Sequence, residues 1–83
     1  MPVVSSLMKR LKDETLLKRF GQRLREARKA KGLTQEVFEE EFGVDQSRLG
    51  RIERGEINIT LSTADMLADA VGVPLSELVS RNK

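Results

Sequence analysis

Apolar side chains recur every three or four residues in the first half of the chain, with Lys, Arg and Gln between them. They are Leu17, Phe20, Leu24 and Ala27. This spacing places them on one face of an α-helix and the polar side chains on the other. The pattern predicts a helix that begins near residues 13–15 and ends at Lys31, before Gly32.

Two shorter helices are predicted next, at residues 34–42 and 45–54, and a tight turn joins them. Each has an apolar pair at helical spacing, which is Phe38 with Phe42 in the first and Leu49 with Ile52 in the second. The expected N-caps are Thr34 and Asp45, and the expected C-terminal glycines are Gly43 and Gly55. Glycine suits a sharp turn because it takes a positive φ at little steric cost.

A fourth helix is expected after Thr60, which suits an N-cap, and it ends at Gly72. Its expected inner face comprises Leu61, Ala64, Leu67, Ala68 and Val71. Pro74 suits the first turn of a short fifth helix. The apolar residues of that helix are Leu75, Leu78 and Val79. No strand-like alternation persists beyond a few residues, so the sequence predicts an all-α fold of five helices.

At 83 residues the chain has room for one small domain. Residues 14–83 are expected to form this domain, with the two short helices and their turn at about 34–55. Residues 1–13 form an N-terminal extension whose apolar residues are Val3, Val4, Leu7, Met8 and Leu11. The extension is either a helix capped by Ser5 or Ser6 or a frayed tail.

The absence of Cys and His narrows the chemistry of the protein. Without Cys the chain can form no disulfide and no Cys-based zinc site. Without His it lacks the commonest general base and the commonest zinc ligand. It also lacks a glycine-rich phosphate loop and a convincing carboxylate pair, which argues against an enzyme and predicts no metal and no cofactor. No apolar run reaches the length of a signal peptide or a membrane span, and a small domain without disulfides fits the cytoplasm.

Charge is distributed unevenly, although the net charge is only +2. Residues 1–33 carry ten basic and three acidic side chains, whereas residues 34–45 carry five acidic side chains and no basic one. Residues 46–55 are basic again, with three Arg and one Glu. Local sign matters more than the total for binding a polyanion, so the basic segments favour contact with nucleic acid. The alternative is that these charges lie on solvated helix faces.

Three segments carry a resemblance to a known family: FGQRLREARKAKGLTQ, FGVDQSRLGRIERGE and NITLSTADMLADAVGVPLSEL. In order and spacing they resemble the lambda-repressor-like (XRE, Cro/repressor-type) DNA-binding domains, from about Phe20 to Val79. The resemblance implies a compact five-helix domain whose third helix enters a DNA groove. The short chain is similar to stand-alone members, which include restriction–modification controller proteins and small phage repressors. The loop RGEINITL resembles the controller proteins.

The resemblance also implies which residues contact double-stranded DNA. Residues at the start of the third helix are expected to face base edges, namely Gln46, Ser47, Arg48 and Arg51. Arg can donate two hydrogen bonds to guanine, and Gln can pair with adenine. Gln35 is expected to contact phosphate at the start of the second helix, where the helix dipole favours an anion. Further candidate phosphate contacts are Arg54, Asn58 and Thr60, with turn and cap chemistry as the alternative for the last two.

Members of this family often pair an Arg of the first helix with a Glu near the end of the third. Arg28 and Glu53 occupy those positions here, so the resemblance implies a structural ion pair between the two helices. Three residues depart from the family pattern. Glu39 and Phe42 replace typically small residues, and Val37 replaces a typically polar one. We expect the Glu39 carboxylate to turn to solvent and the packing of the second helix on the third to loosen.

The acidic residues of the second helix would be repelled by phosphate if they faced DNA. In activating members of the family an acidic patch on this helix contacts RNA polymerase. The resemblance implies this role for Glu36, Glu39 and Glu40. The alternative is a solvated face that aids solubility.

A single domain of this kind reads only a few base pairs, whereas a two-fold dimer reads two half-sites about 34 Å apart. Candidate dimer residues are Ile57, Ile59, Met66, Val73, Leu75 and Val79, with a core role as the alternative and the N-terminal apolar stripe Val3–Leu11 as the rival surface. We therefore predict a homodimeric transcription regulator that binds a palindromic operator, with autoregulation of a restriction–modification operon as a specific role. The alternative function is an antitoxin or bridging protein-interaction module of the same fold.

Overall fold

The computed structural model describes residues 14–81, which form helices and no strand. The helices are α2 (Glu14–Ala30), α3 (Gln35–Phe42), α4 (Gln46–Glu53), α5 (Leu61–Val71) and α6 (Leu75–Val79). The prediction of an all-α fold is confirmed, and the helix bounds agree closely with those expected. Within residues 14–81, no helix has both the length and the apolar character needed to cross a bilayer. The predicted N-terminal extension, with its Ser5 or Ser6 cap, lies outside the described residues.

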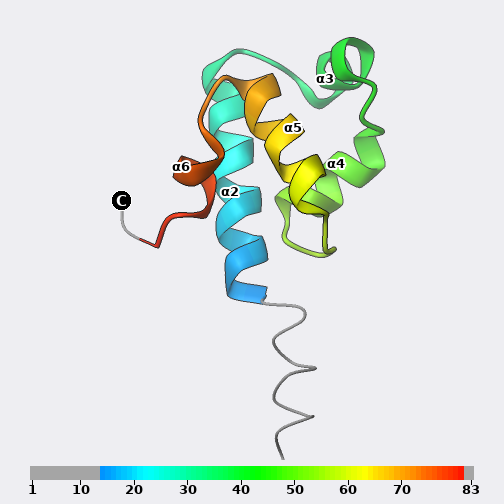
Figure 1. Ribbon diagram of the computed structural model, residues 1–83. Coiled ribbons are helices and arrows are strands. Elements are labelled where there is room, and N and C mark those ends of the chain that lie inside the picture. The colour runs from blue at the N-terminus through cyan, green and yellow to red at the C-terminus, as the bar shows by residue number, and fades with distance from the viewer. Residues whose placement is uncertain (1–13, 82–83) are drawn as a thin grey trace, which may run out of the picture.

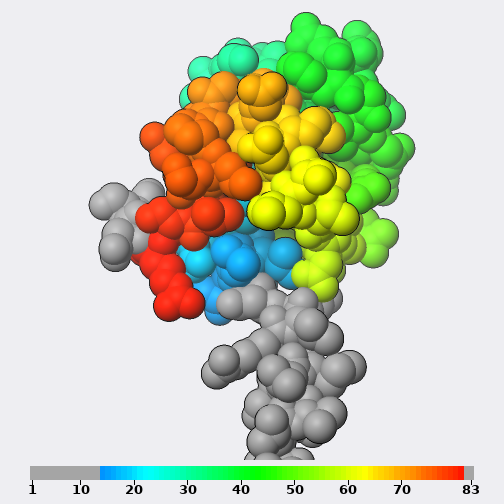
Figure 2. Space-filling view, in the orientation of Figure 1, coloured from blue at the N-terminus to red at the C-terminus, as the bar shows by residue number. Residues whose placement is uncertain are grey.

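The long α2 is the element on which the other helices assemble (Figure 1). α4, α5 and α6 all pack against α2, whereas α3 packs on α4. In Figure 1, α3 and α4 lie on one side of α2 and α6 lies on the other. Figure 2 shows α5 and α6 covering much of α2 in this view, with α3 at the edge of the molecule. The two short helices therefore form one side of the domain.

Side-chain caps start three helices at the residues that the sequence indicated. Thr34 Oγ1 accepts from the backbone N–H of Val37 at 3.1 Å, and Asp45 Oδ2 accepts from that of Arg48 at 3.0 Å. Thr60 caps α5 in the same way. Each cap satisfies a backbone donor that the first turn of a helix leaves free. The predicted glycines Gly43 and Gly55 have φ values of 71° and 72° and allow the chain to leave α3 and α4 sharply.

The core lies where the apolar faces of the helices meet. Its fully buried side chains include Leu24, Phe38, Leu49 and Leu67. The predicted inner face of α5 is wrong at Leu61, which is 77% exposed. Leu61 is the first residue of that helix, and the buried stripe begins one turn later at Ala64 and also includes Ala70. Phe42, at the end of α3, contacts the Phe38 ring with centroids 4.9 Å apart and is 38% exposed.

α2 holds α4 on one side and α6 on another. A Cβ added to Gly21 would lie 2.3 Å from the Ile52 carbonyl oxygen, so only glycine allows α2 and α4 to approach this closely. Arg19 Nε donates to the Val79 carbonyl at 3.2 Å, and Arg23 donates to carbonyls at the C-terminal end of α6. The last carbonyls of a helix lack N–H donors from the next turn, and here the arginines of α2 donate to carbonyls at this helix end.

Candidate nucleic-acid interface

α4 has one face fixed in the core and one face of exposed polar residues. Its inward residues are Leu49, Gly50, Ile52 and Glu53, all buried. Its outward residues are the expected base contacts: Ser47, Arg48 and Arg51 are exposed, and Gln46 is half-buried. Three of the four, Gln46, Ser47 and Arg48, lie in the first turn, directly after the Asp45 cap. This arrangement suits a helix that presents its N-terminal end to a groove of DNA.

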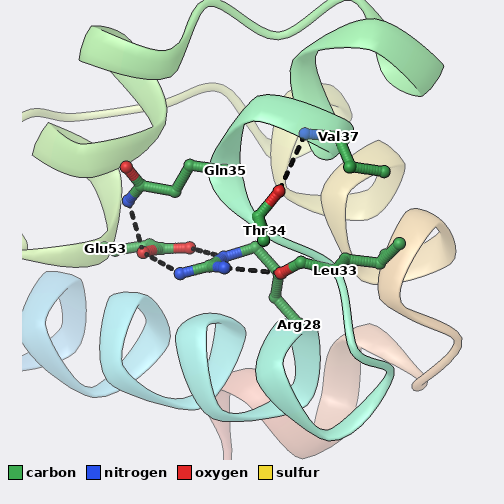
Figure 3. Close-up of polar contacts among 6 residues, drawn as sticks. All are labelled: Arg28, Leu33, Thr34, Gln35, Val37 and Glu53. Atoms are coloured by element: carbon green, nitrogen blue, oxygen red, sulfur yellow. Dashed lines mark hydrogen bonds and ion pairs between the residues drawn. The ribbon is translucent and has the colours of Figure 1, made fainter.

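A buried ion pair joins α2 to the C-terminal end of α4 (Figure 3). Arg28 Nε donates to Glu53 Oε2 at 2.7 Å, and Arg28 Nη2 donates to Glu53 Oε1 at 3.1 Å. The two side chains are only 6% and 3% exposed. Arg28 Nη1 also donates to the carbonyl of Leu33 at 2.6 Å, in the segment that leads into α3. One guanidinium thus connects α2, the start of α3 and the end of α4.

Gln35, the expected phosphate contact at the start of α3, belongs to the same network. Its Nε2 donates to Glu53 Oε1 at 3.1 Å (Figure 3). The Glu53 carboxylate therefore accepts three hydrogen bonds, two from Arg28 and one from Gln35. A buried carboxylate that is paired and hydrogen-bonded in this way avoids the large cost of an unsatisfied charge. The network also fixes which way the Gln35 amide points.

The expectation that Glu39 turns its carboxylate to solvent is wrong. Glu39 is half-buried, and its Oε1 accepts a hydrogen bond of 3.1 Å from Nε2 of Gln46. A longer side chain at this position in α3 reaches the first residue of α4, and the half-buried Gln46 amide supplies a donor. A candidate base contact is therefore hydrogen-bonded to the neighbouring helix.

Two adjoining cavities line the side of the domain where α2 meets α4. One, of about 340 Å³, is bordered by Arg25, Arg28, Gln35, Gly50, Glu53 and Arg54. The second, of about 510 Å³, is bordered by Lys18, Gln22, Arg25, Glu26, Lys29, Glu53 and Arg54. Both cavities bring together side chains from α2 and from the end of α4, and most of their exposed charges are positive.

The sequence predictions did not single out the basic residues of α2 that border these two cavities. Lys18, Arg25 and Lys29 lie on one face of α2, because they are spaced seven and four residues apart. That spacing was a readable signal, but only the folded chain places this face next to Gln35 and Arg54. Arg25 borders both cavities and is the candidate phosphate contact that sequence reasoning missed.

The other candidate phosphate residues lie near the loop between α4 and α5. Arg54 is exposed and pairs with Glu56, with Nε 2.9 Å from Oε2. The hydrogen bond from Arg54 lowers the pKa of the Glu56 carboxyl, and the same bond raises the pKa of Arg54. Asn58 is exposed, whereas the Thr60 hydroxyl caps α5 and donates to Thr63 Oγ1. The predicted cap chemistry therefore occupies Thr60.

The acidic residues of α3 fall into two groups. Glu36 and Glu40 are exposed, whereas Glu39 is half-buried and bonded to Gln46. The candidate dimer residues also divide. Met66 is 44% exposed on α5, and the other five are half-buried against the core, namely Ile57, Ile59, Val73, Leu75 and Val79. Met66 is thus the most available of the six to a second chain.

Comparisons with known proteins agree with this geometry. Residues 24–78 match the family model described as helix-turn-helix. The chain is 36% identical over 63 residues to the control protein C.MunI of a Mycoplasma species, covering 75% of this chain and 85% of that protein. It is 43% identical over 60 residues to the uncharacterized HTH-type transcriptional regulator y4dJ of Sinorhizobium fredii, covering 72% and 78%. The crystal structure of the restriction–modification controller protein C.AhdI from Aeromonas hydrophila matches with a TM-score of 0.67 and 47% identity, over 75% of this chain and 94% of that one.

The fold and the exposed face of α4 define a DNA-binding domain of the helix-turn-helix class. The chain belongs to the helix-turn-helix family of the XRE type and is a transcriptional regulator. The resemblance to lambda-repressor-like domains is confirmed, and the matched proteins are regulators rather than enzymes.

Proposed function

We propose that this protein binds a palindromic operator as a homodimer and controls expression of a restriction–modification operon. The observation that carries the proposal is the 47% identity and shared fold with C.AhdI, a restriction–modification controller protein, over 94% of that chain. Because the match covers nearly all of the controller, it includes the whole helix-turn-helix rather than one motif. The exposed polar start of α4 supports the same conclusion, since the Arg28–Glu53 pair holds the other end of this helix on α2.

The first turn of α4 is the proposed reading element. Arg48 and Arg51 are exposed and can each make bidentate contacts to guanine, while Gln46 pairs with adenine and Ser47 accepts several bases. Replacing Arg48 by Ala should cost about 1–3 kcal/mol of discrimination at one base pair in each half-site. A loss of equal size on all DNA sequences would instead make Arg48 a phosphate contact.

The proposed phosphate contacts lie at and beyond the C-terminal end of α4, whose first turn is the reading element. Gln35 and Arg54 border the same cavity as Arg25, and Asn58 and Thr60 follow in the loop. Contacts of this kind hold the protein in register on the duplex and carry no sequence information. Arg25→Ala should therefore weaken binding to every sequence alike and reduce the salt dependence of binding by about one phosphate contact.

Dimerisation is proposed to use one apolar surface made by Met66, the exposed candidate on α5, together with the half-buried candidates of the loop and α6. Met66→Glu would place a charge in that surface and should yield a monomer in sedimentation experiments. Leu61→Glu is the matched control, because Leu61 is also an exposed apolar residue of α5. A dimer that survives Met66→Glu would move the interface elsewhere.

Glu36 and Glu40 are proposed to contact RNA polymerase, with Glu39 as the third member of the acidic patch. Support comes from the exposure of Glu36 and Glu40 on α3, away from the Phe38 that anchors the helix. Charge-reversed Glu36→Lys and Glu40→Lys should bind operator yet fail to activate transcription in a reconstituted assay. Full activation by both variants would leave the patch as a solvated face.

The deciding experiment is selection of bound DNA from a random pool at fixed salt, because affinity for DNA depends steeply on ionic strength. A palindromic consensus is expected, with half-sites about one helical turn apart. Failure to enrich any sequence would contradict the proposal and favour an antitoxin or bridging module whose main partner is a protein.

A further inference from the structure

Glu39 lies on α3 where this helix meets α4, and it accepts a hydrogen bond from a residue proposed to read a base. Nε2 of Gln46, the first residue of α4, donates to Oε1 of Glu39 on α3 at 3.1 Å. Both side chains are half-buried. Buried neighbours hold both helices in place, since Phe38 precedes Glu39 and Leu49 lies one turn after Gln46. The contact therefore joins two firmly placed backbone segments.

The chemistry of the contact fixes the orientation of the amide. A glutamine side chain has two N–H donors on one side and a carbonyl acceptor on the other. A neighbour that both donates and accepts, such as a hydroxyl group, can bond to either side. An ionised carboxylate only accepts hydrogen bonds. Glu39 therefore attracts the NH2 group of Gln46 and repels its carbonyl oxygen. One N–H is used by Glu39, and the second N–H and the carbonyl oxygen remain available in a fixed order.

We propose that Glu39 is a positioning residue that sets the base preference of Gln46, an inference that rests on the proposed function of α4. Adenine presents an acceptor, N7, and a donor, the N6 amino group, in the major groove. The free N–H of Gln46 donates to N7 while its carbonyl oxygen accepts from N6. The opposite order of donor and acceptor is disfavoured, because it turns the amide carbonyl toward the Glu39 carboxylate. Glu39 thus selects adenine through Gln46 without touching DNA itself.

A second glutamine shows what is particular about Glu39. Gln35 also donates to a carboxylate, but that carboxylate, Glu53, is paired with Arg28. Among residues 14–81, no cation forms an ion pair with Glu39. The charge of Glu39 is therefore not neutralised by an ion pair. Glu39 lies next to the start of α4, which is proposed to approach DNA. We expect Glu39 to lower affinity for DNA in general while it raises the preference for one base.

The test compares Glu39→Gln with the parent protein on the duplex selected from a random library. Binding is measured by fluorescence anisotropy at fixed salt, on the selected duplex and on duplexes with single base-pair changes. Gln46→Ala first assigns the base pair that Gln46 reads. At that pair alone, Glu39→Gln should reduce discrimination about tenfold, within the range expected for one bidentate contact. Its affinity for unrelated duplex DNA should rise.

Two controls separate positioning from charge and from folding. Glu41→Gln makes the same charge change at an exposed position of α3 and should keep the parent's discrimination at every base pair. In a Gln46→Ala background, Glu39→Gln should cause no further change in discrimination. Glu39→Ala, which removes the acceptor and leaves a small side chain, should reproduce the effect of Glu39→Gln, with thermal melting to show that each variant is folded.

The outcomes are distinct. Parental discrimination in Glu39→Gln at the pair assigned to Gln46 would overturn the inference and leave the proposed function standing. An equal loss in Glu41→Gln would also overturn it, because the effect would then be one of charge alone. A parent protein that prefers no DNA sequence would overturn the proposed function and this inference with it.

Discussion

Two arginine–glutamate pairs lie close together at the end of α4, and they differ mainly in burial. Arg28 and Glu53 are 2.7 Å apart with side chains 6% and 3% exposed, whereas Arg54 and Glu56 are 2.9 Å apart with side chains 60% and 49% exposed. The distances are almost the same. The buried pair joins three elements of the fold, and the exposed pair occupies a cation proposed to contact phosphate. The distance between the charged atoms alone therefore says little about what an ion pair does.

The physical reason lies in the surroundings of each pair. Water and salt screen an exposed pair, so it contributes little to the free energy of unfolding. A buried pair repays the loss of hydration only through good geometry and further hydrogen bonds, which Gln35 and the Leu33 carbonyl supply here. Once such a pair has formed, removing one member leaves the other charge buried without a partner.

The largest effect is expected from Glu53→Gln. It leaves the buried Arg28 guanidinium without a counter-charge and should lower the free energy of unfolding by about 3–5 kcal/mol. DNA binding should weaken together with stability, because the ion pair that holds α4 on α2 is lost. Urea unfolding and operator binding measure the two effects. Glu56→Gln, the same chemical change in the exposed pair, is the control for the unfolding measurement. If Glu53→Gln melts like the parent protein, the buried pair has no structural role.

The next largest effect is expected from Gly21→Ala, which prevents the close approach of α2 and α4 beside the buried pair. The new Cβ would meet the backbone carbonyl oxygens of Ile52 and Glu53 at 2.3 and 2.5 Å, so α2 and α4 must separate. Overpacking of this kind costs about 1–3 kcal/mol of unfolding free energy. Gly50→Ala is the matched control, because its Cβ would meet only the flexible end of the Arg54 side chain. Equal melting temperatures for the two variants would contradict this account.

A smaller effect is expected from Glu56→Gln on DNA binding. The substitution releases the Arg54 guanidinium from its partner and removes a negative charge near the proposed phosphate contacts. Affinity should rise a few-fold on all sequences alike, with a steeper dependence on salt concentration. Anisotropy titrations at several salt concentrations measure this. An unchanged salt dependence would mean that Arg54 does not approach phosphate.

The smallest effect concerns stability against pH. Because the hydrogen bond from Arg54 lowers the pKa of Glu56 below its ordinary value of 4.5, the pair stabilises the fold at pH values above that range. This contribution is lost as the pH falls through the lowered pKa and the carboxylate takes up a proton. The difference in unfolding free energy between the parent and Glu56→Gln should therefore shrink toward acid pH and at high salt. A difference that grows toward acid pH would reverse the sign of the linkage.

The sequence by itself determined the helices and their ends. Thr34, Asp45 and Thr60 cap the helices that they were expected to cap. The apolar spacing of α2, α3 and α4 places Leu24, Phe38 and Leu49 in the core. These features were predictable because a cap or a periodic stripe depends on residues within a turn or two of each other. Leu61 fails the rule because the first residue of α5 lies beyond the buried stripe of that helix.

Only the tertiary structure decided the partners of the polar side chains. It places Arg25 of α2 beside Gln35 of α3 and Arg54, although the three are far apart along the chain. It also gives the Glu39 carboxylate the amide of Gln46, where solvent was expected. Helix periodicity states which way a side chain points from its own axis. What that side chain meets depends on where the other helices lie, and packing of the apolar core decides their positions.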